Sequence, residues 1–274
     1  MCIRDRFHIV INEQTKPIIE HVGELRNRFI RIMISILVCT FILFALSTRD
    51  ITIDGRDFLI PYPNIYNNIA SQIITILQEI VLPEYVRVIL TTPGQALSAQ
   101  IYVSIMCGIV ISIPLILWEI IGFVKPGLYK NEIKLLRNLL VPSSVLFFVG
   151  AVFALFVMIP MTMEFLYKYG VALEAETYIT INEFVSFIVF FMMAFGLAFQ
   201  LPIVMWLTTR LGFIKSTFWR DNWRYTLVFL VAIGAVITPD ASGITMWLIT
   251  IPMMLLYFIG YLASRNTKST RTKS

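Results

Sequence analysis

Six long apolar runs dominate the sequence and leave few folds open to it. They lie at about 29–47, 99–122, 139–160, 184–208, 225–238 and 244–263. Most are near the ~20 residues that a helix needs to cross a hydrocarbon layer of ~30 Å. Hydrophobic residues make up 58% of the chain, which is more than a soluble domain of this length can bury. The sequence therefore predicts an integral membrane protein with six spans.

These runs are predicted to form a curved helical bundle, an all-α membrane fold. Helices satisfy their own backbone hydrogen bonds in lipid, and the runs lack the alternating pattern of barrel strands. Pro114, Pro160, Pro202 and Pro252 lie in or at the ends of the runs, where they are expected to bend helices. The fifth run, of about 14 residues, is shorter than the hydrocarbon layer. The fifth and sixth spans are both expected to be short.

Charged residues predict the orientation of the spans. Lys and Arg are retained on the cytoplasmic side of a membrane. Basic residues crowd the N-terminal segment 1–28, the second and fourth connections and the tail 264–274, whereas the first and third connections are rich in Asp and Glu. Both termini are therefore predicted to be cytoplasmic, in a single membrane domain that occupies residues 1–274.

The two acidic connections are expected to form the outer side of the protein. The first is long and contains an amphipathic stretch near residues 65–81, so we expect a compact extracytoplasmic cap rather than a structureless loop. The third ends in Thr180-Ile-Asn-Glu183. This is the pattern of a capping box, which predicts that a helix begins there.

Several classes of function lack the residues they need. Ionisable residues are nearly missing from the spans, His8 and His21 both precede the first span, and no HExxH, GxSxG or phosphate-binding loop occurs. Cys2, Cys39 and Cys107 lack metal-binding spacing. The net charge of +5 is explained by membrane topology. We therefore expect no enzyme activity, no cofactor, no metal site and no nucleic-acid partner.

Two acidic residues, Glu24 and Glu132, stand in basic segments close to apolar runs. A carboxylate pair in such a place suits a cationic ligand, because each carboxylate can accept bidentate hydrogen bonds from an arginine. A structural role is open for both residues. Glu24 and Arg28 have the spacing of a helical ion pair, and Lys134 or Arg137 could neutralise Glu132.

Four motifs resemble, in order, those of the TatC family, the polytopic subunit of the twin-arginine protein translocase. His21-Val-Gly-Glu-Leu-Arg-Asn-Arg28 is similar to the family's His-Leu-x-Glu-Leu-Arg-x-Arg signature. Phe123-Val-Lys-Pro-Gly-Leu-Tyr-Lys-Asn-Glu132 resembles its loop Phe-x-x-Pro-(Gly or Ala)-Leu-Tyr-x-x-Glu. Residues 194–202 resemble its fourth-span motif, and Thr238-Pro-Asp240 resembles its outer turn. The resemblance covers nearly everything from 15 to 263.

The resemblance implies a receptor subunit. TatC binds the twin-arginine signal peptides of folded precursor proteins and assembles with small single-span partners, TatA and TatB, for transport driven by the proton-motive force. It also implies a homo-oligomer within a larger complex, surrounded by membrane lipid. The expected location is the bacterial cytoplasmic (inner) membrane, or the mitochondrial inner membrane if an organelle encodes the chain.

The first two motifs hold most of the site that the resemblance implies. Glu24 and Glu132 are expected to contact the signal peptide. The side chains expected to shape the site around them are His21, Leu25, Arg26, Phe123, Pro126, Leu128 and Tyr129. Surface ion pairs contribute only about 0–1 kcal/mol each, so apolar contact along a groove beside spans one, two and four is expected to add the rest.

The later motifs hold the residues expected to meet partners. Gln200 stands where many relatives carry Glu, so a proton relay there is doubtful, and its amide could bond a partner helix or bundle backbone. Gly234, Ala235 and Thr238 form a small-residue surface for close helix approach, although packing within the bundle explains them equally well. The outer turn would contain Pro239 and Asp240.

The alternative from another class is a secondary transporter or a channel for small solutes. Such a protein needs a line of polar residues across the midplane of the membrane. The sequence offers a single polar residue there, Gln200. A purely structural scaffold is a third class. It is distinguished by whether Glu24 and Glu132 come together at one surface.

Overall fold

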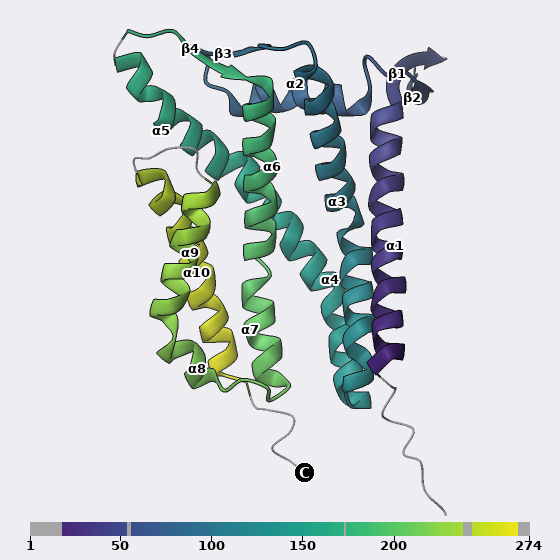
Figure 1. The fold of residues 1–274 in the computed structure, drawn as a ribbon, viewed down its shortest axis with the longest axis vertical. Coiled ribbons are helices and arrows are strands. Elements are labelled where there is room, and N and C mark those ends of the chain that lie inside the picture. Colours follow the sequence, from purple (N-terminus) through teal and green to yellow (C-terminus); the bar gives the residue numbers. More distant parts are fainter. Residues whose placement is uncertain (1–17, 54–55, 173, 238–242, 268–274) are drawn as a thin grey trace, which may run out of the picture.

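The computed structural model describes residues 18–53, 56–172, 174–237 and 243–267. Most helices run along the long axis of the molecule, and the short strands gather at one end, which we call the strand end (Figure 1). The other end, which we call the basic end, holds the start of α1 (Ile18–Ala45), the end of α3 (Gln95–Val124) and the short helix α8 (Ser216–Asp221). Its described basic residues include Arg26, Arg28, Arg31, Lys125, Lys134, Arg137, Lys215, Arg220, Arg224 and Arg265.

A helix covers each of the six apolar runs. Five helical stretches are long and apolar enough to cross a membrane: Val22–Ala45, Gln95–Gly127, Glu132–Ala172, Ile181–Arg210 and Ile244–Arg265. The helix at the fifth run, α9 (Trp223–Ile237), has 15 residues and is therefore only ~22 Å long. The helix of the fifth run is thus as short as expected, whereas the prediction of a short sixth span is wrong. α10 (Ile244–Arg265) has 22 residues, because the helix tolerates Pro252 and continues to the C-cap at Asn266.

α1 packs almost entirely against α3, and small residues set the close approach of the two helices. A Cβ on Gly108 would lie 2.6 Å from the Thr40 hydroxyl and 3.1 Å from the Ile36 carbonyl oxygen, so a larger residue there would force α1 or the Thr40 side chain to move. The hydroxyls of Ser35 and Ser112 are hydrogen-bonded at 3.0 Å. Much of the remaining surface of α1 is exposed and apolar, as expected of a helix that faces lipid.

The third span belongs to a helix much longer than the predicted 139–160. It consists of α4 (Lys130–Phe153), a π-helical turn η2 (Ala154–Met158) and α5 (Ile159–Ala172). It runs obliquely through the molecule, from beside α3 at the basic end to the strand end (Figure 1). The π turn directly precedes Pro160, whose ring cannot accept the regular α-helical backbone of the preceding turn.

The fourth span is interrupted, and its first half forms the centre of the core. α6 (Ile181–Ala198) ends in a turn at Phe199 and Gln200, and α7 (Leu201–Arg210) restarts with Pro202 in its first turn. A Cβ on Gly196 would lie 2.7 Å from the Phe147 ring of α4. In return, a Cβ on Gly150 of α4 would lie 2.7 Å from the Phe195 carbonyl oxygen. The two helices thus interlock through a glycine on each.

The strand end is built from the long first connection and the third. β1 (Leu46–Ile53) and β2 (Arg56–Pro63) form an antiparallel pair, and β3 (Val86–Ile89) pairs in parallel with β4 (Thr177–Thr180). The amphipathic stretch forms α2 (Ile69–Val81), which lies across this end of the bundle (Figure 1). The all-α expectation is therefore corrected, since four short strands accompany the helices among the described residues.

Candidate functional site

An ion-pair cluster joins α1 to α3 at the basic end. The Nη2 of Arg28 donates to Oε1 of Glu24 at 2.7 Å, one helical turn earlier, and its Nη1 donates to Oε2 of Glu119 on α3 at 2.8 Å. Arg31 approaches the other oxygen of Glu119 at 3.4 Å. Two carboxylates and two guanidinium groups therefore form one locally neutral cluster.

The cluster lies at the edge of the protein, with the deeper part on α3. The side chains of Arg28 and Glu24 are 21% and 23% exposed, whereas that of Glu119 is only 8% exposed. Burying a carboxylate is unfavourable unless it is paired, so Glu119 requires the guanidinium of Arg28. The expected helical pair between Glu24 and Arg28 is present, and it is extended by a contact that spans 91 residues of sequence.

Gly122 fixes the path of the Arg28 side chain. A Cβ at this position would overlap Nη1 of Arg28 and would lie 2.8 Å from its Cζ. The guanidinium therefore lies directly against the backbone of α3, one turn after Glu119. Glycine at position 122 is what leaves room for it.

The loop between α3 and α4 lies at the same end of the molecule. It contains the 3-10 turn η1 (Lys125–Gly127), and α4 begins directly after Tyr129. Glu132 is 3% exposed, and its Oε2 accepts a hydrogen bond from the Tyr129 backbone N–H at 3.0 Å. Its carboxylate thereby caps the N-terminus of α4, where negative charge is favoured. Glu132 is thus a buried structural acid as well as a candidate ligand.

The other residues expected at the site differ in exposure. Leu25 and Arg26 are exposed on the first turns of α1, Phe123 and Leu128 are half-buried, and Pro126 and Tyr129 are exposed on the loop. His21 lies in α1, but its side chain is outside the described residues. Because α1 packs on α3 and the loop directly follows α3, the structure brings both predicted acids to the basic end.

Sequence reasoning assigned no role at this site to Glu119 and only a helical ion pair to Arg28. Glu119 carried a usable signal, because an acidic residue within a long apolar run is costly and generally has a specific partner. The identity of that partner could not be inferred, because nothing in the spacing links residue 28 to residue 119.

The residues expected to meet partners have contacts within the chain. The Gln200 side-chain amide donates to the Ser143 carbonyl oxygen of α4 at 3.0 Å. Gly234 is buried against α10, where a Cβ would lie 3.0 Å from the Met246 carbonyl oxygen. Ala235 is exposed. The remaining members of this set lie outside the described residues: Thr238, Pro239 and Asp240.

Four of the buried hydroxyls in the spans are bonded to their own helices. Ser104, Ser144, Thr162 and Thr250 each donate to the carbonyl oxygen of the residue four positions earlier. Within the described part of the chain, no group of three or more His, Cys, Asp or Glu residues could hold a metal ion. These contacts do not favour a transport path for solutes.

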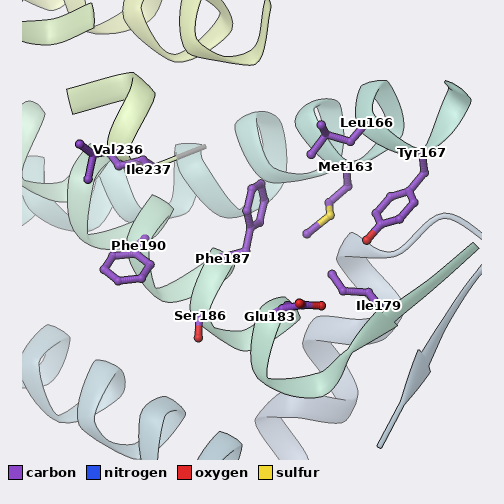
Figure 2. A pocket seen from close by; sticks show the side chains of 10 residues that line it. All are labelled: Met163, Leu166, Tyr167, Ile179, Glu183, Ser186, Phe187, Phe190, Val236 and Ile237. Atoms are coloured by element: carbon purple, nitrogen blue, oxygen red, sulfur yellow. The ribbon is translucent and has the colours of Figure 1, made fainter. Parts of the chain in front are cut away.

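A cavity of about 420 Å³ lies toward the strand end, between α5, β4, α6 and the end of α9. Figure 2 shows its lining, which is mostly apolar side chains such as Phe187 and Met163, with the carboxylate of Glu183 among them. Glu183 takes part in the predicted capping box, because its backbone N–H donates to the Thr180 hydroxyl at 3.3 Å and its carboxylate accepts from the Thr180 N–H. This carboxylate therefore serves to start α6. The cavity is separate from the ion-pair cluster around Arg28.

Comparison with known proteins links the fold to one family. The family model described as Sec-independent protein translocase protein (TatC) matches residues 20–252. The chain is 38% identical to a Sec-independent protein translocase protein TatC of Cenarchaeum symbiosum (92% of this chain, 96% of that protein) and 33% identical to that of Aquifex aeolicus (92% and 98%). It is also similar to a crystal structure of a twin-arginine translocase receptor TatC, with a TM-score of 0.74, 31% identity, and coverage of 89% of this chain and 98% of that one.

Proposed function

Because the chain belongs to the TatC family of Sec-independent protein translocase subunits, a family of multi-pass membrane proteins, we propose that its basic end is a receptor for twin-arginine signal peptides. The observation that carries the proposal is the cluster around Arg28. Carboxylates from two helices already hold one guanidinium group there. The same arrangement suits a guanidinium group from a ligand.

Arginine fits this cluster better than lysine. A guanidinium carries five N–H donors in a planar fork and can bond two carboxylates at once, whereas an ammonium acts as a point charge. The cluster is locally neutral, so an incoming arginine must exchange with Arg28 for the acids. That exchange would favour a ligand that offers two adjacent guanidinium groups over one that offers a single positive charge.

Apolar contact supplies the remaining affinity in this proposal. The exposed face of α1 continues from Leu25 to Phe29 and Met33, all large apolar side chains. The hydrophobic stretch of a signal peptide would lie along this side of the bundle, where each buried CH₂ contributes ~0.8 kcal/mol. Tyr129 and Pro126, exposed on the neighbouring loop, would contact the polar part of the peptide.

The remaining parts of the proposal concern the assembly. The basic end faces the cytoplasm, and the strand end faces the outside, because basic residues are retained on the cytoplasmic side. The protein acts with other copies of itself and with TatA- and TatB-type single-span proteins, in transport driven by the proton-motive force. The single-span partners would approach α9 and α10, where Ala235 is exposed.

Site-specific photocrosslinking tests the receptor proposal. A photoreactive amino acid replaces Leu25, next to Glu24, and the protein is mixed in membranes with a precursor that bears Arg-Arg or Lys-Lys in its signal. We expect crosslinks with Arg-Arg only, and we expect Glu24→Gln to abolish them. Glu79→Gln is the matched control, because Glu79 is an exposed acid on α2 at the strand end.

Crosslinks that form equally with Arg-Arg and Lys-Lys, or that survive Glu24→Gln, would contradict the proposal. A second photoreactive position at Phe41, exposed near the other end of α1, should not depend on the arginine pair. If its crosslinks do depend on the arginine pair, that dependence arises from overall insertion of the precursor and not from the ion-pair cluster.

A further inference from the structure

Two further arginines, Arg220 of α8 and Arg224 of α9, lie at the basic end beside aromatic rings of α8, α9 and α10. One groove of about 240 Å³ is lined by Trp219, Arg220, Trp223, Tyr257, Phe258 and Tyr261. An adjoining hollow of about 530 Å³ shares Arg220 and Trp223 and is also lined by Asp221, Arg224, Tyr225 and Val228. The two hollows therefore form one continuous surface with arginines between two apolar sides.

The inner wall of this surface is fixed by hydrogen bonds. The indole N–H of Trp219 donates to the Thr209 hydroxyl at 3.1 Å, and the Tyr257 hydroxyl donates to the Trp219 carbonyl oxygen at 2.6 Å. Tyr257 is buried, whereas Trp223 and Phe258 are exposed on the outer side. The site is thus a rigid aromatic wall with an open apolar rim.

The two arginines are held only by weak contacts. Arg220 bonds the carboxylate of its neighbour Asp221 at 3.0 Å, with both side chains more than 60% exposed, and such exposed pairs hold their partners loosely. Arg224 lies over the Trp223 ring, with its guanidinium carbon 5.7 Å from the ring centroid. Both can turn toward an anion without breaking a buried contact. The Asp221 carboxylate would have to move away from that anion.

The short helix α9 explains why a lipid would reach this surface. A 15-residue helix is ~22 Å long, about 8 Å less than the hydrocarbon layer. The bilayer beside such a helix thins, and its headgroups move toward the helix ends. At the basic end the first residues reached are Trp223 and Arg224, which begin α9. Aromatic and basic side chains at this depth are typical of the membrane interface.

We propose that this surface binds an anionic phospholipid of the bilayer, with its phosphate between Arg220 and Arg224 and an acyl chain against Trp223 and Phe258. Positive charge recognises the phosphodiester, and the apolar rim requires a ligand with hydrocarbon chains. A free phosphate would use only the first of these features. The inference depends on the geometry of α8–α10 and not on signal-peptide binding.

Native mass spectrometry of the full-length protein in detergent tests the site. Phosphatidylglycerol, phosphatidylcholine or soluble glycerol 3-phosphate is added, and the retained adduct is measured. We expect retention of phosphatidylglycerol alone. Arg220→Gln/Arg224→Gln should reduce it roughly 25-fold, because each basic residue near a membrane surface contributes roughly a five-fold attraction to anionic lipid. Trp223→Ala/Phe258→Ala should also reduce it.

The control variant is Lys134→Gln/Arg137→Gln, which removes two exposed positive charges from α4 at the same end. It should retain phosphatidylglycerol as the unmodified protein does. Equal loss in both charge variants would overturn the proposal, because it would indicate general attraction to the basic end. Equal retention of phosphatidylcholine or of glycerol 3-phosphate, or no retention of phosphatidylglycerol by the unmodified protein, would overturn it too. Size-exclusion chromatography verifies that each variant is folded.

Discussion

Arg28 connects two helices through two carboxylates that differ in their surroundings. Glu24 lies one turn before it on the same helix and is partly exposed, whereas Glu119 is nearly buried on α3. The helical spacing predicts the first contact, because residues four apart share a face. It cannot predict the second, which depends on how α1 packs against α3. The sequence therefore predicted one of the two ion pairs of Arg28 and not the other.

Gly122→Ala tests this cluster by adding a single methyl group. In Gly122→Ala the new Cβ would collide with the Arg28 guanidinium, a flexible group that can move away. We expect a loss of about 1–2 kcal/mol in stability, since Arg28 would lose its bond to Glu119. In an Arg28→Gln background the same alanine should cost much less, because the collision is gone. Denaturant unfolding in detergent micelles measures both costs.

Gly23→Ala is the matched control for this cycle. Gly23 also lies in a helix near the cluster, but a Cβ there would have no atom within 4 Å, so alanine should be neutral or slightly stabilising. An equal cost of Gly122→Ala with and without Arg28 would mean that the alanine disturbs the backbone of α3 and not the ion pair.

For helices and strands, the sequence predicted features that depend on neighbouring residues. It did not predict contacts between segments that are far apart in the chain. The capping box at Thr180 and Glu183 predicted the start of α6, and its hydrogen bonds are present. The amphipathic stretch predicted α2. The parallel pairing of Val86–Ile89 with Thr177–Thr180 could not be predicted, because each strand is four residues long and the partners are far apart in sequence. The length of the helix through Ala172 was underestimated, because its polar end lacks the hydropathy of a span.

The interlocking of α4 and α6 leads to a prediction about stability. A Cβ on Gly150 would meet the Phe195 carbonyl oxygen at 2.7 Å and the Phe199 ring at 2.8 Å. Backbone cannot move aside as a flexible side chain does, so we expect Gly150→Ala to destabilise the protein by about 1–3 kcal/mol. The measurement is the denaturation midpoint in detergent, with Gly127→Ala as control, because a Cβ at Gly127 has no neighbour within 4 Å. Equal midpoints for the two variants would refute close packing at this crossing.

Across the whole molecule, charge and secondary structure divide between the two ends. The strands and α2 lie at one end, and the start of α1, the loop before α4 and α8 lie at the other (Figure 1). The alternation of basic and acidic connections predicted which segments would share an end, because each apolar helix moves the chain from one end to the other.

Cysteine labelling tests the orientation of this arrangement. Tyr66→Cys and Pro126→Cys place a thiol at an exposed position at the strand end and at the basic end, in a background with Cys2, Cys39 and Cys107 replaced by alanine. A membrane-impermeant maleimide added to intact cells should label position 66 and should label position 126 only after permeabilisation. The reverse labelling pattern would mean that the proposed topology is inverted, with the ion-pair cluster outside the cell.

The oblique helix from Glu132 to Ala172 has a mechanical consequence. Its 41 residues form a rod ~62 Å long, which begins at the basic end and ends at the strand end (Figure 1). A tilt of one degree about one end of such a rod moves the other end by ~1 Å. The π turn at Ala154–Met158 interrupts the regular α-helical hydrogen bonding of this rod. A displacement at the basic end would therefore be transmitted to the strand end by one continuous helical stretch, whose π turn lies near its middle.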